Sequence, residues 1–282
     1  MIYSASPPSL LPRSFATGFP HPMSLVPAFV PPVDALNGCG DTLWGNLGDW
    51  SEASGYVEAA EALALRLGQA AGLGAGQRIV DVGCGAGDQL RLWTGAFGVR
   101  HITAVEKDAA LAARARRRVA DWGLEESVRV VAGEATAAPW ADGPADAVLA
   151  LDAAYFFDSR KEFLRRCRSA LRPGGVLALT DLLLGDGPSA PIARGVAPLF
   201  SVSRGSLLPE SLYRATLADH GFEGVSMEDR TGDVLGGFAR WTRGGGHRIS
   251  HLGLSATGRM AGFLARSGCL RYVLVTARRC GT

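Results

Sequence analysis

The stretch Arg78-Ile79-Val80-Asp81-Val82-Gly83-Cys84-Gly85-Ala86-Gly87-Asp88 decides the fold of this chain. The β-branched residues in its first half are typical of a buried strand, and the glycines at alternate positions then break that strand. Glycine has no Cβ, so such a turn can adopt unusual dihedral angles and let a ligand lie against the backbone. The helix that follows directs free N–H groups and a positive dipole end at that ligand. The stretch therefore predicts a site for a nucleotide-like molecule.

Strands and helices alternate around this turn. Strands are expected at 78–82, 101–105, 128–132, 146–151 and 175–180, with helices at 88–97, 108–122 and 159–171. A helix at 209–220, a strand at 222–227, a helix at 254–265 and a strand at 270–276 follow. This rhythm predicts an α/β fold, a Rossmann-like doubly wound sheet of seven strands. Five strands are expected to be parallel, and the last two to form a C-terminal antiparallel hairpin.

The segments outside this core are expected to cover the ligand. Asp49 and Glu52 form a candidate capping box that opens a helix through about Leu67, as an N-terminal helical lid. Residues 182–208 lack a clear period and form an insertion after the fifth strand, and 232–246 are expected to be a loop. We expect a single domain over 34–282, with its core at 78–181 and lid or substrate elements at 42–70 and 182–250.

Residues 1–33 differ in composition from the rest. They hold eight of the fifteen prolines, one arginine and no acidic residue. Proline at this density opposes a packed helix or sheet, so we expect a poorly ordered leader. The favoured interpretation is a non-essential leader with the true start near Met23, and an organellar transit peptide is the alternative.

Bulk composition excludes several classes of protein. The 282 residues are 47% hydrophobic and 20% charged, with a net charge of +2, which does not favour nucleic acid or an anionic membrane as partner. No apolar run is long enough to span a bilayer, so no stable membrane insertion is expected. The five cysteines never form a C-x-x-C pair, and His247 and His251 lack a third ligand. We therefore expect no metal and a reducing, cytoplasmic location.

The spacing of the glycines distinguishes between nucleotide sites. A dinucleotide turn, G-x-G-x-x-G from Gly83, needs a third glycine where Asp88 stands, and a P-loop needs a Gly-Lys-Ser/Thr that is absent. The second strand ends at Glu106, 23 residues after Gly83. A carboxylate there can accept two hydrogen bonds from a ribose diol, although this feature also suits a nicotinamide nucleotide.

Three further segments give the turn its context. The D-x-G-x-G-x-G pattern from Asp81 to Gly87 resembles the first motif of class I S-adenosylmethionine-dependent methyltransferases. The third-strand segment 131–140 resembles the family's G-D-A-x-x-L-P-F, with Glu134 for Asp and Trp140 for Phe. Residues 146–148 match its F-D-x-V, and 171–181 match its L-x-P-G-G-x-L. The likeness covers about 42–230 and is nearest to the ubiquinone- and menaquinone-type (type 11) branch and its small-molecule relatives.

This resemblance implies S-adenosylmethionine as the cofactor. The glycine turn would run beside its methionine part, Glu106 would bind the ribose, and Glu134 would bind the adenine amino group with help from the backbone of Ala135. The residues carried over as cofactor-binding are Tyr56, Asp81, Gly83, Gly85, Gly87, Gln89, Glu106, Lys107, Glu134, Ala135 and Leu151.

The reacting groups are less well marked in the sequence. Asp152 and Tyr155 follow the fourth strand, on the face where the family transfers the methyl group, and are the candidate catalytic residues. Relatives often carry a histidine in a Y-H-F segment where this chain has Phe156, so a simple base at that position is in doubt. An aromatic pocket wall is the alternative role for Tyr155 and Phe156. The N/D-P-P-Y/F motif of enzymes that methylate planar amino groups is absent.

The sequence thus predicts a methyltransferase that acts on O, N or C of a small, largely apolar molecule. Two alternatives remain open: an NAD(P)-dependent oxidoreductase with a Rossmann fold, and a non-catalytic S-adenosylmethionine-binding protein. The arginines at 114 and 116–118 are interpreted as a solvated helix face, not as a nucleic-acid site. The oligomeric state stays open.

Overall fold

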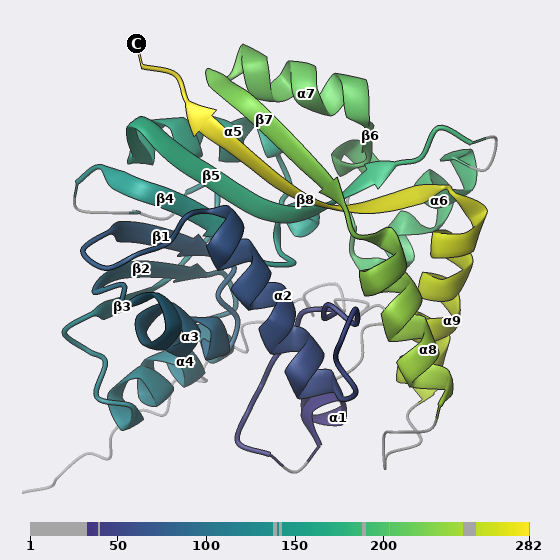
Figure 1. The fold of residues 1–282 in the computed structure, drawn as a ribbon, viewed down its shortest axis with the longest axis horizontal. Coiled ribbons are helices and arrows are strands. Elements are labelled where there is room, and N and C mark those ends of the chain that lie inside the picture. Colours follow the sequence, from purple (N-terminus) through teal and green to yellow (C-terminus); the bar gives the residue numbers. More distant parts are fainter. Residues whose placement is uncertain are drawn as a thin grey trace, which may run out of the picture.

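The chain folds around one mixed β-sheet, shown as a ribbon in Figure 1. The structure is a computed structural model and describes residues 33–38, 40–137, 140, 143–187, 190–202, 204–244 and 252–281. The strand order is β3-β2-β1-β4-β5-β8-β7, and β6 pairs with β5 off this path. Strands β1 to β5 pair in parallel, whereas β8 is antiparallel to both β5 and β7. This confirms the predicted α/β class, the parallel core and the C-terminal hairpin.

The strand bounds follow the predictions in the core and extend them at the edge. The strands are β1 (Arg78–Val82), β2 (His101–Glu106), β3 (Val128–Ala132), β4 (Ala145–Ala150), β5 (Leu171–Leu184), β6 (Leu208–Pro209), β7 (Phe222–Asp229) and β8 (Leu270–Arg279). The sheet has eight strands where seven were predicted, because the two-residue β6 pairs with the end of β5. A two-residue strand is too short for an alternating pattern to mark it in the sequence.

Helices lie on both sides of the sheet and above its carboxyl edge. The α-helices are α1 (Val33–Asn37), α2 (Tyr56–Ala70), α3 (Asp88–Phe97), α4 (Ala109–Asp121), α5 (Arg160–Ala170), α6 (Ala190–Val196), α7 (Glu210–Asp219), α8 (Gly237–Arg243) and α9 (Leu252–Ser267). Short helical turns lie at Ala154–Phe156, Ala197–Phe200, Arg204–Ser206 and Gly232–Gly236. Helices α6, α8 and α9 gather at one end of the molecule, on the right in Figure 1.

Alternation along the strands builds a core on each face. Ile79 packs into one apolar cluster with α2 and α3, whereas its neighbour Val80 packs into the other cluster with α5 and α7. Leu149 and Val148 repeat this division on β4. Successive side chains of a strand point to opposite faces, so a strand covered on both sides is apolar throughout. No helix in the described residues is long and apolar enough to cross a membrane.

The prediction for the start of the N-terminal helix is wrong. Helix α2 begins at Tyr56 after an uncapped Gly55, not at an Asp49–Glu52 capping box. The Asp49 carboxylate is buried and bonds to Arg66 at 2.6 Å and to Arg230 at 2.7 Å. The Asp49 carboxylate therefore forms tertiary ion pairs and does not cap the helix that its spacing to Glu52 predicted.

The insertion is also more regular than expected. Residues 232–243, predicted to be a loop, form a π-helical turn that continues into α8, and α6 lies within the stretch predicted to be irregular. Helix α9 and strand β8 confirm their predictions. The predicted leader, apart from Val33, and both His247 and His251 lie outside the described residues.

Candidate cofactor and acceptor site

A cavity of about 610 Å³ lies where the carboxyl ends of β1, β2 and β4 meet. Its lining includes the glycine turn after β1, the acid at the end of β2 and the segments after β3 and β4. Nine of the predicted site residues line it: Gly83, Gly85, Gln89, Glu106, Lys107, Glu134, Ala135, Leu151 and Asp152. Parallel strands end at the same edge of a sheet, which is why residues so distant in the sequence converge there.

The glycine turn presents bare backbone to this cavity. Gly83 and Gly85 have φ values of +83° and +55°, in the left-handed region that favours glycine. A Cβ on Gly83 would lie 2.4 Å from the Cβ of Ala153, so a side chain is excluded there. A Cβ on Gly85 would meet no atom within 4 Å, so this side of the turn is open. Gly87, with φ of +91°, precedes α3 as its N-cap and is not part of the cavity lining.

Glu106 fixes the geometry of the turn and still faces the cavity. One carboxylate oxygen accepts the Gly85 N–H at 2.8 Å, and the other accepts the Asp108 N–H at 2.9 Å. A carboxylate has about four acceptor positions, so two remain for a ligand. The side chain therefore has the capacity for a diol that the sequence predicted.

Asp81 lies behind the turn and not in the cavity lining. Its Oδ2 accepts the indole N–H of Trp93 at 3.0 Å, whereas its Oδ1 is buried without a partner. Burial raises the pKa of Asp81 to about 7, against the lowering effect of hydrogen bonds from Trp93 and Gln89. A buried carboxylate oxygen without a partner costs free energy, so a cationic group placed nearby would be stabilised.

The far end of the cavity is more open to solvent. Lys107 and Glu134 are both more than half exposed, and their charged atoms are 3.9 Å apart. An exposed pair at this separation contributes little to stability, which leaves both side chains free to reorient toward a ligand. Ala135, in contrast, is buried.

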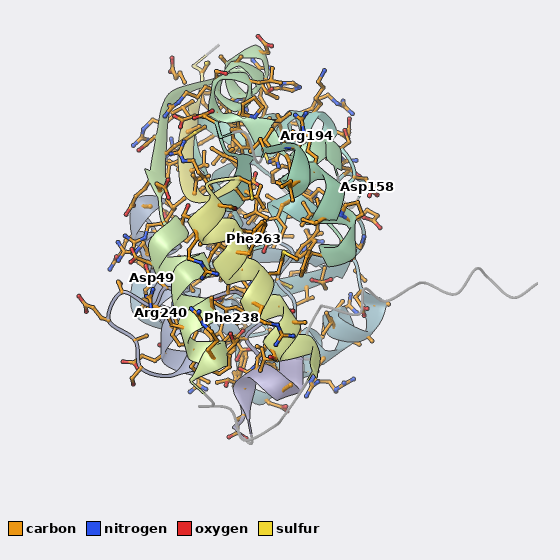
Figure 2. The ribbon with its side chains drawn as sticks, turned by 90° about the vertical axis from the view of Figure 1, so that its right-hand side faces the viewer. Asp49, Asp158, Arg194, Phe238, Arg240 and Phe263 are labelled. Carbon is orange, nitrogen blue, oxygen red and sulfur yellow. The ribbon has the colours of Figure 1, made fainter. Side chains whose placement is uncertain are left out.

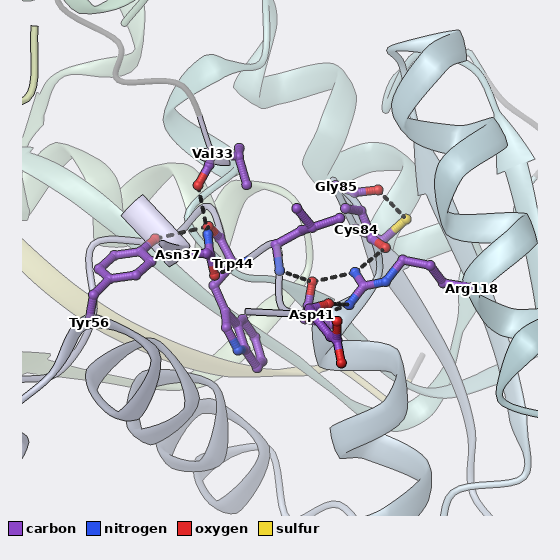
Figure 3. A network of polar contacts seen from close by, with 11 residues as sticks. Val33, Asn37, Asp41, Trp44, Tyr56, Cys84, Gly85 and Arg118 are labelled. Carbon is purple, nitrogen blue, oxygen red and sulfur yellow. Dashed lines mark hydrogen bonds and ion pairs between the residues drawn. The ribbon is translucent and has the colours of Figure 1, made fainter. Parts of the chain in front are cut away.

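A loop of residues 41–50, here called the lid loop, lines the cavity through residues 43–46. Figure 3 shows the polar contacts around Trp44 and Asp41 of this loop. Asn37 accepts the Trp44 N–H at 2.9 Å and donates to the Trp44 carbonyl oxygen at 2.8 Å. The Leu47 N–H donates to Asp152 at 2.6 Å, which connects the lid loop to the end of β4. Tyr56 does not line the cavity, and its hydroxyl lies 2.7 Å from the Asn46 carbonyl oxygen. Its position supports the lid loop from behind.

Arg118 anchors the other end of the lid loop. Its guanidinium group binds both oxygens of Asp88, at 2.5 and 2.6 Å, and donates to the carbonyl oxygens of Ala86 and Asp41. Asp88 in turn accepts the Leu43 N–H at 3.1 Å. The interpretation of this arginine as part of a solvated helix face is therefore wrong. Its role depends on partners that only the fold brings to it.

A second, smaller cavity of about 200 Å³ adjoins the first and is almost wholly apolar. The two share Val33, Gly45, Asn46 and Phe156 in their linings. The walls of the second cavity, here called the apolar chamber, come largely from the insertion and from helices α8 and α9. They include Leu182, Ala193, Val196, Leu207, Leu235, Phe238, Met260, Ala261 and Leu264.

Tyr155 lines the apolar chamber and is buried close to the charge of Asp152, which lines the first cavity. Asp152 accepts hydrogen bonds from Tyr272 and Thr180. Burial raises the pKa of Asp152 despite these donors, and burial beside Asp152 raises the pKa of Tyr155 well above its usual value. Asp152 has a φ of +49°, an uncommon angle for a residue other than glycine that is often found at functional sites. The two candidate catalytic residues thus bridge the two cavities.

The sequence did not mark Tyr272 and Thr180 as partners of Asp152. Motifs relate residues that are close along the chain, whereas these partners lie on other strands of the sheet. Asp181, inside β5, lines neither cavity. It is buried in an ion pair with Arg160 and accepts the Tyr213 hydroxyl at 2.7 Å.

Comparisons with known proteins agree with this geometry. Residues 80–179 match a family described as "Methyltransferase domain". The 27-O-demethylrifamycin SV methyltransferase of Amycolatopsis mediterranei is 32% identical over 202 residues, which cover 70% of this chain and 74% of that protein. The erythromycin 3''-O-methyltransferase of Saccharopolyspora erythraea is 28% identical over 200 residues. These cover 67% of this chain and 65% of that protein, just under two thirds of its length.

The fold is also found in solved structures. The geranyl diphosphate C-methyltransferase of Streptomyces coelicolor A3(2) superposes with a TM-score of 0.68 at 19% identity, over 89% of this chain and 91% of that one.

Proposed function

Because the chain belongs to the class I S-adenosylmethionine-dependent methyltransferase family, we propose that it methylates a hydroxyl group of a small, largely apolar molecule. S-adenosylmethionine is its cofactor, and when bound it supplies an electrophilic methyl group on a sulfonium sulfur. The observation that carries the proposal is the pair of joined cavities, a polar one at the strand ends and an apolar chamber beside it.

Residues of the first cavity would hold the cofactor. Glu106 has two free acceptor positions for the ribose diol, and the open face of Gly85 lets a ligand lie against the backbone. The partnerless Oδ1 of Asp81 suits the cationic amino group of a methionine moiety. Glu134 and Ala135 would meet the adenine. These observations support the assignments carried over from the family motifs.

The apolar chamber would hold the acceptor. Its lining side chains are aliphatic or aromatic apart from Asn46, Tyr155 and Thr257, so a charged acceptor would lose its hydration there without compensation. The chamber meets the first cavity at Phe156, so an acceptor atom at this junction would face the methyl donor. Alignment of the two reactants in one enclosed site can lower a barrier by about 7–11 kcal/mol.

Tyr155 and Asp152 would remove the acceptor's proton. Bound S-adenosylmethionine would supply the methyl group and leave as a neutral thioether, so the acceptor hydroxyl would have one proton to lose. The hydroxyl proton passes to the Tyr155 oxygen, and the Tyr155 proton passes to the Asp152 carboxylate. The raised pKa of Tyr155 keeps it protonated and suits it to a relay, while the raised pKa of Asp152 makes that carboxylate a better base. This pairing favours oxygen over carbon as the acceptor.

Two O-methyltransferase relatives support the choice of a hydroxyl. One is named erythromycin 3''-O-methyltransferase and the other 27-O-demethylrifamycin SV methyltransferase, and both names refer to a methyl group on oxygen. Asp88 stands where a dinucleotide-binding turn needs its third glycine, and this argues against a nicotinamide cofactor. A cofactor-binding protein without transfer activity stays the alternative that experiment must exclude.

The remaining expectations are proposals of the same kind. We propose that 34–282 form one methyltransferase domain, with its core at 78–181 and its lid and substrate elements at 42–70 and 182–250. A cytoplasmic location is supported by Cys84, Cys167, Cys269 and Cys280, which are all unpaired thiols. The acceptor is the expected partner, and no nucleic-acid partner is proposed.

The proposed function can be tested with S-adenosylmethionine that carries a radiolabelled methyl group and with a cell extract as the source of acceptor. Label should enter an organic-soluble product, and that product then serves as the assay substrate. Tyr155→Phe should lower kcat by about 10²–10⁴-fold while S-adenosylhomocysteine binds as in the parent, because the phenylalanine lacks only the relay oxygen. If no label is transferred while S-adenosylhomocysteine binds, the non-catalytic alternative holds. If transfer survives in Tyr155→Phe at the parent's rate, the proton relay is wrong.

A further inference from the structure

The helices that enclose the apolar chamber are basic and carry no acid. The sequence contains no Asp or Glu between Asp186 and Glu210, and none after Asp233. The second of these stretches alone holds the arginines at 240, 243, 248, 259, 266, 271, 278 and 279. The whole protein has a net charge of only +2, so its positive charge is concentrated at this end of the chain.

The described arginines of helices α6, α8 and α9 are exposed. They are Arg194 on α6, Arg240 and Arg243 on α8, and Arg259 and Arg266 on α9. Among the residues that the structure describes, none of these five forms an ion pair. Their hydrogen-bond partners are uncharged, such as the Ser255 hydroxyl for Arg259 and the Leu207 carbonyl oxygen for Arg194. We call the exposed surface of these three helices the basic cap.

Apolar side chains stand among these charges. Phe263 is 41% exposed, and the spacing 259–263–266 places it on the same face of α9 as Arg259 and Arg266. Ile192 on α6 is 49% exposed. Figure 2 shows Phe263, Arg194 and Arg240 on one side of the molecule, the side formed by α6, α8 and α9. A basic face with interspersed exposed apolar residues is typical of elements that lie on a membrane surface.

Among the described residues, no carboxylate forms an ion pair with an arginine of the basic cap. Asp49, which Figure 2 labels at one edge of this side, is 1% exposed and already paired with Arg66 and Arg230. Asp158, at the opposite edge, is exposed and lines the first cavity. None of the described residues that line the apolar chamber is an arginine, so an anion that the cap attracts would stay outside the chamber.

We propose that the basic cap docks on an anionic lipid bilayer. Charge complementarity supplies the attraction, since each Arg near an anionic leaflet favours binding. Phe263 and Ile192 would enter the interfacial region, as exposed apolar residues do in peripheral proteins. An acidic protein would satisfy the arginines, but the two apolar residues stand singly among them and form no anchoring pocket for a partner side chain. The contact is peripheral and leaves the core fold unchanged.

The direct test is sedimentation of the full chain with vesicles. Vesicles of phosphatidylcholine alone are compared with vesicles of equal parts phosphatidylcholine and phosphatidylglycerol, at low and at high salt. The cap variant is Arg259→Glu/Arg266→Glu. The matched control is Arg114→Glu/Arg117→Glu, which changes the net charge equally at exposed positions of α4. Phe263→Ser removes the apolar contribution without a change of charge.

We expect the parent to sediment with the anionic vesicles only, and salt to release it. The cap variant should lower the partition coefficient by roughly tenfold or more, and the control should leave it near the parent value. Phe263→Ser should weaken binding at low salt, although it leaves the net charge unchanged. Thermal unfolding and S-adenosylhomocysteine binding, measured on every variant, verify that each is folded.

Three outcomes overturn the proposal. The parent does not bind anionic vesicles, the α4 control loses as much binding as the cap variant, or the folded cap variant binds like the parent. Capture of an acidic protein by the cap, without binding to vesicles, also overturns it and assigns the surface to a protein partner. None of these outcomes bears on methyl transfer, which is measured separately.

Discussion

Replacement of Glu106 by alanine tests the cofactor assignment most directly. The Glu106 carboxylate uses one oxygen for the Gly85 N–H at 2.8 Å and the other for the Asp108 N–H at 2.9 Å. Two acceptor positions remain for a ribose diol. Hydrogen bonds to a charged group contribute about 1.5–3 kcal/mol each, so the loss of two should cost at least about 3 kcal/mol of binding. At about 1.4 kcal/mol per tenfold, S-adenosylhomocysteine should bind Glu106→Ala about 100-fold more weakly or worse.

The variant also removes two hydrogen bonds of the protein itself, so the assay needs a control for disorder of the turn. Asp108→Ala removes the neighbouring acid, which caps α4 through the N–H groups of Ala110 and Leu111 and does not line the cavity. Loss of such a cap costs about 1 kcal/mol of stability. We expect calorimetry to show near-parental S-adenosylhomocysteine binding by Asp108→Ala and much weaker binding by Glu106→Ala.

Two results would refute this reasoning. If Glu106→Ala binds S-adenosylhomocysteine as tightly as the parent, the carboxylate does not hold the ribose. If both variants lose affinity equally, the loss follows from disorder at the strand end and not from a direct contact.

Three further perturbations probe the surroundings of the site. Burial raises the pKa of Asp81 from 3.8 to about 7, so the parent loses stability as pH rises between these values. Asp81→Asn should therefore gain more thermal stability relative to the parent at about pH 8 than at about pH 5. An equal difference at both pH values would contradict the shift. Arg118→Met leaves the buried Asp88 carboxylate without its counter-ion and frees the lid loop. It should lower the free energy of unfolding by about 3 kcal/mol and weaken S-adenosylhomocysteine binding in calorimetry. Unchanged binding would exclude a role of the lid loop in holding the cofactor. Asp181→Asn leaves the buried Arg160 guanidinium without its counter-ion. It should lower the free energy of unfolding, measured in urea, by about 3–5 kcal/mol and leave cofactor affinity unchanged. Lost affinity in the folded variant would show that the ion pair affects the cofactor site.

Local patterns were sufficient for the core of the sheet. The run from Ile79 to Val82 could be recognised as a strand because buried parallel strands are apolar on both faces. Gly83 and Gly85 marked the turn because their dihedral angles exclude most side chains. Glu106 could be assigned to the same edge because parallel strands end together. The family likeness rested on these segments, and the comparisons confirm it.

Local patterns were misleading where a side chain bonds across the fold. Asp49 has the spacing of a helix cap, but its carboxylate binds Arg230, 181 positions away. Arg118 stands in a row of arginines on one helix, but it alone meets Asp88 and the lid loop. Charge and spacing along the chain do not encode which partner a long side chain reaches.

The sequence by itself therefore determined the α/β sheet, the glycine turn and the cofactor edge, because backbone conformation and strand direction follow from nearby residues. Only the tertiary structure decided what surrounds that edge. Asp152 accepts a hydrogen bond from the hydroxyl of Tyr272, 120 positions later. The walls of the apolar chamber come largely from the insertion, from α8 and from α9, which are separate in the sequence. Such contacts depend on how the elements pack, and packing is a property of the whole chain.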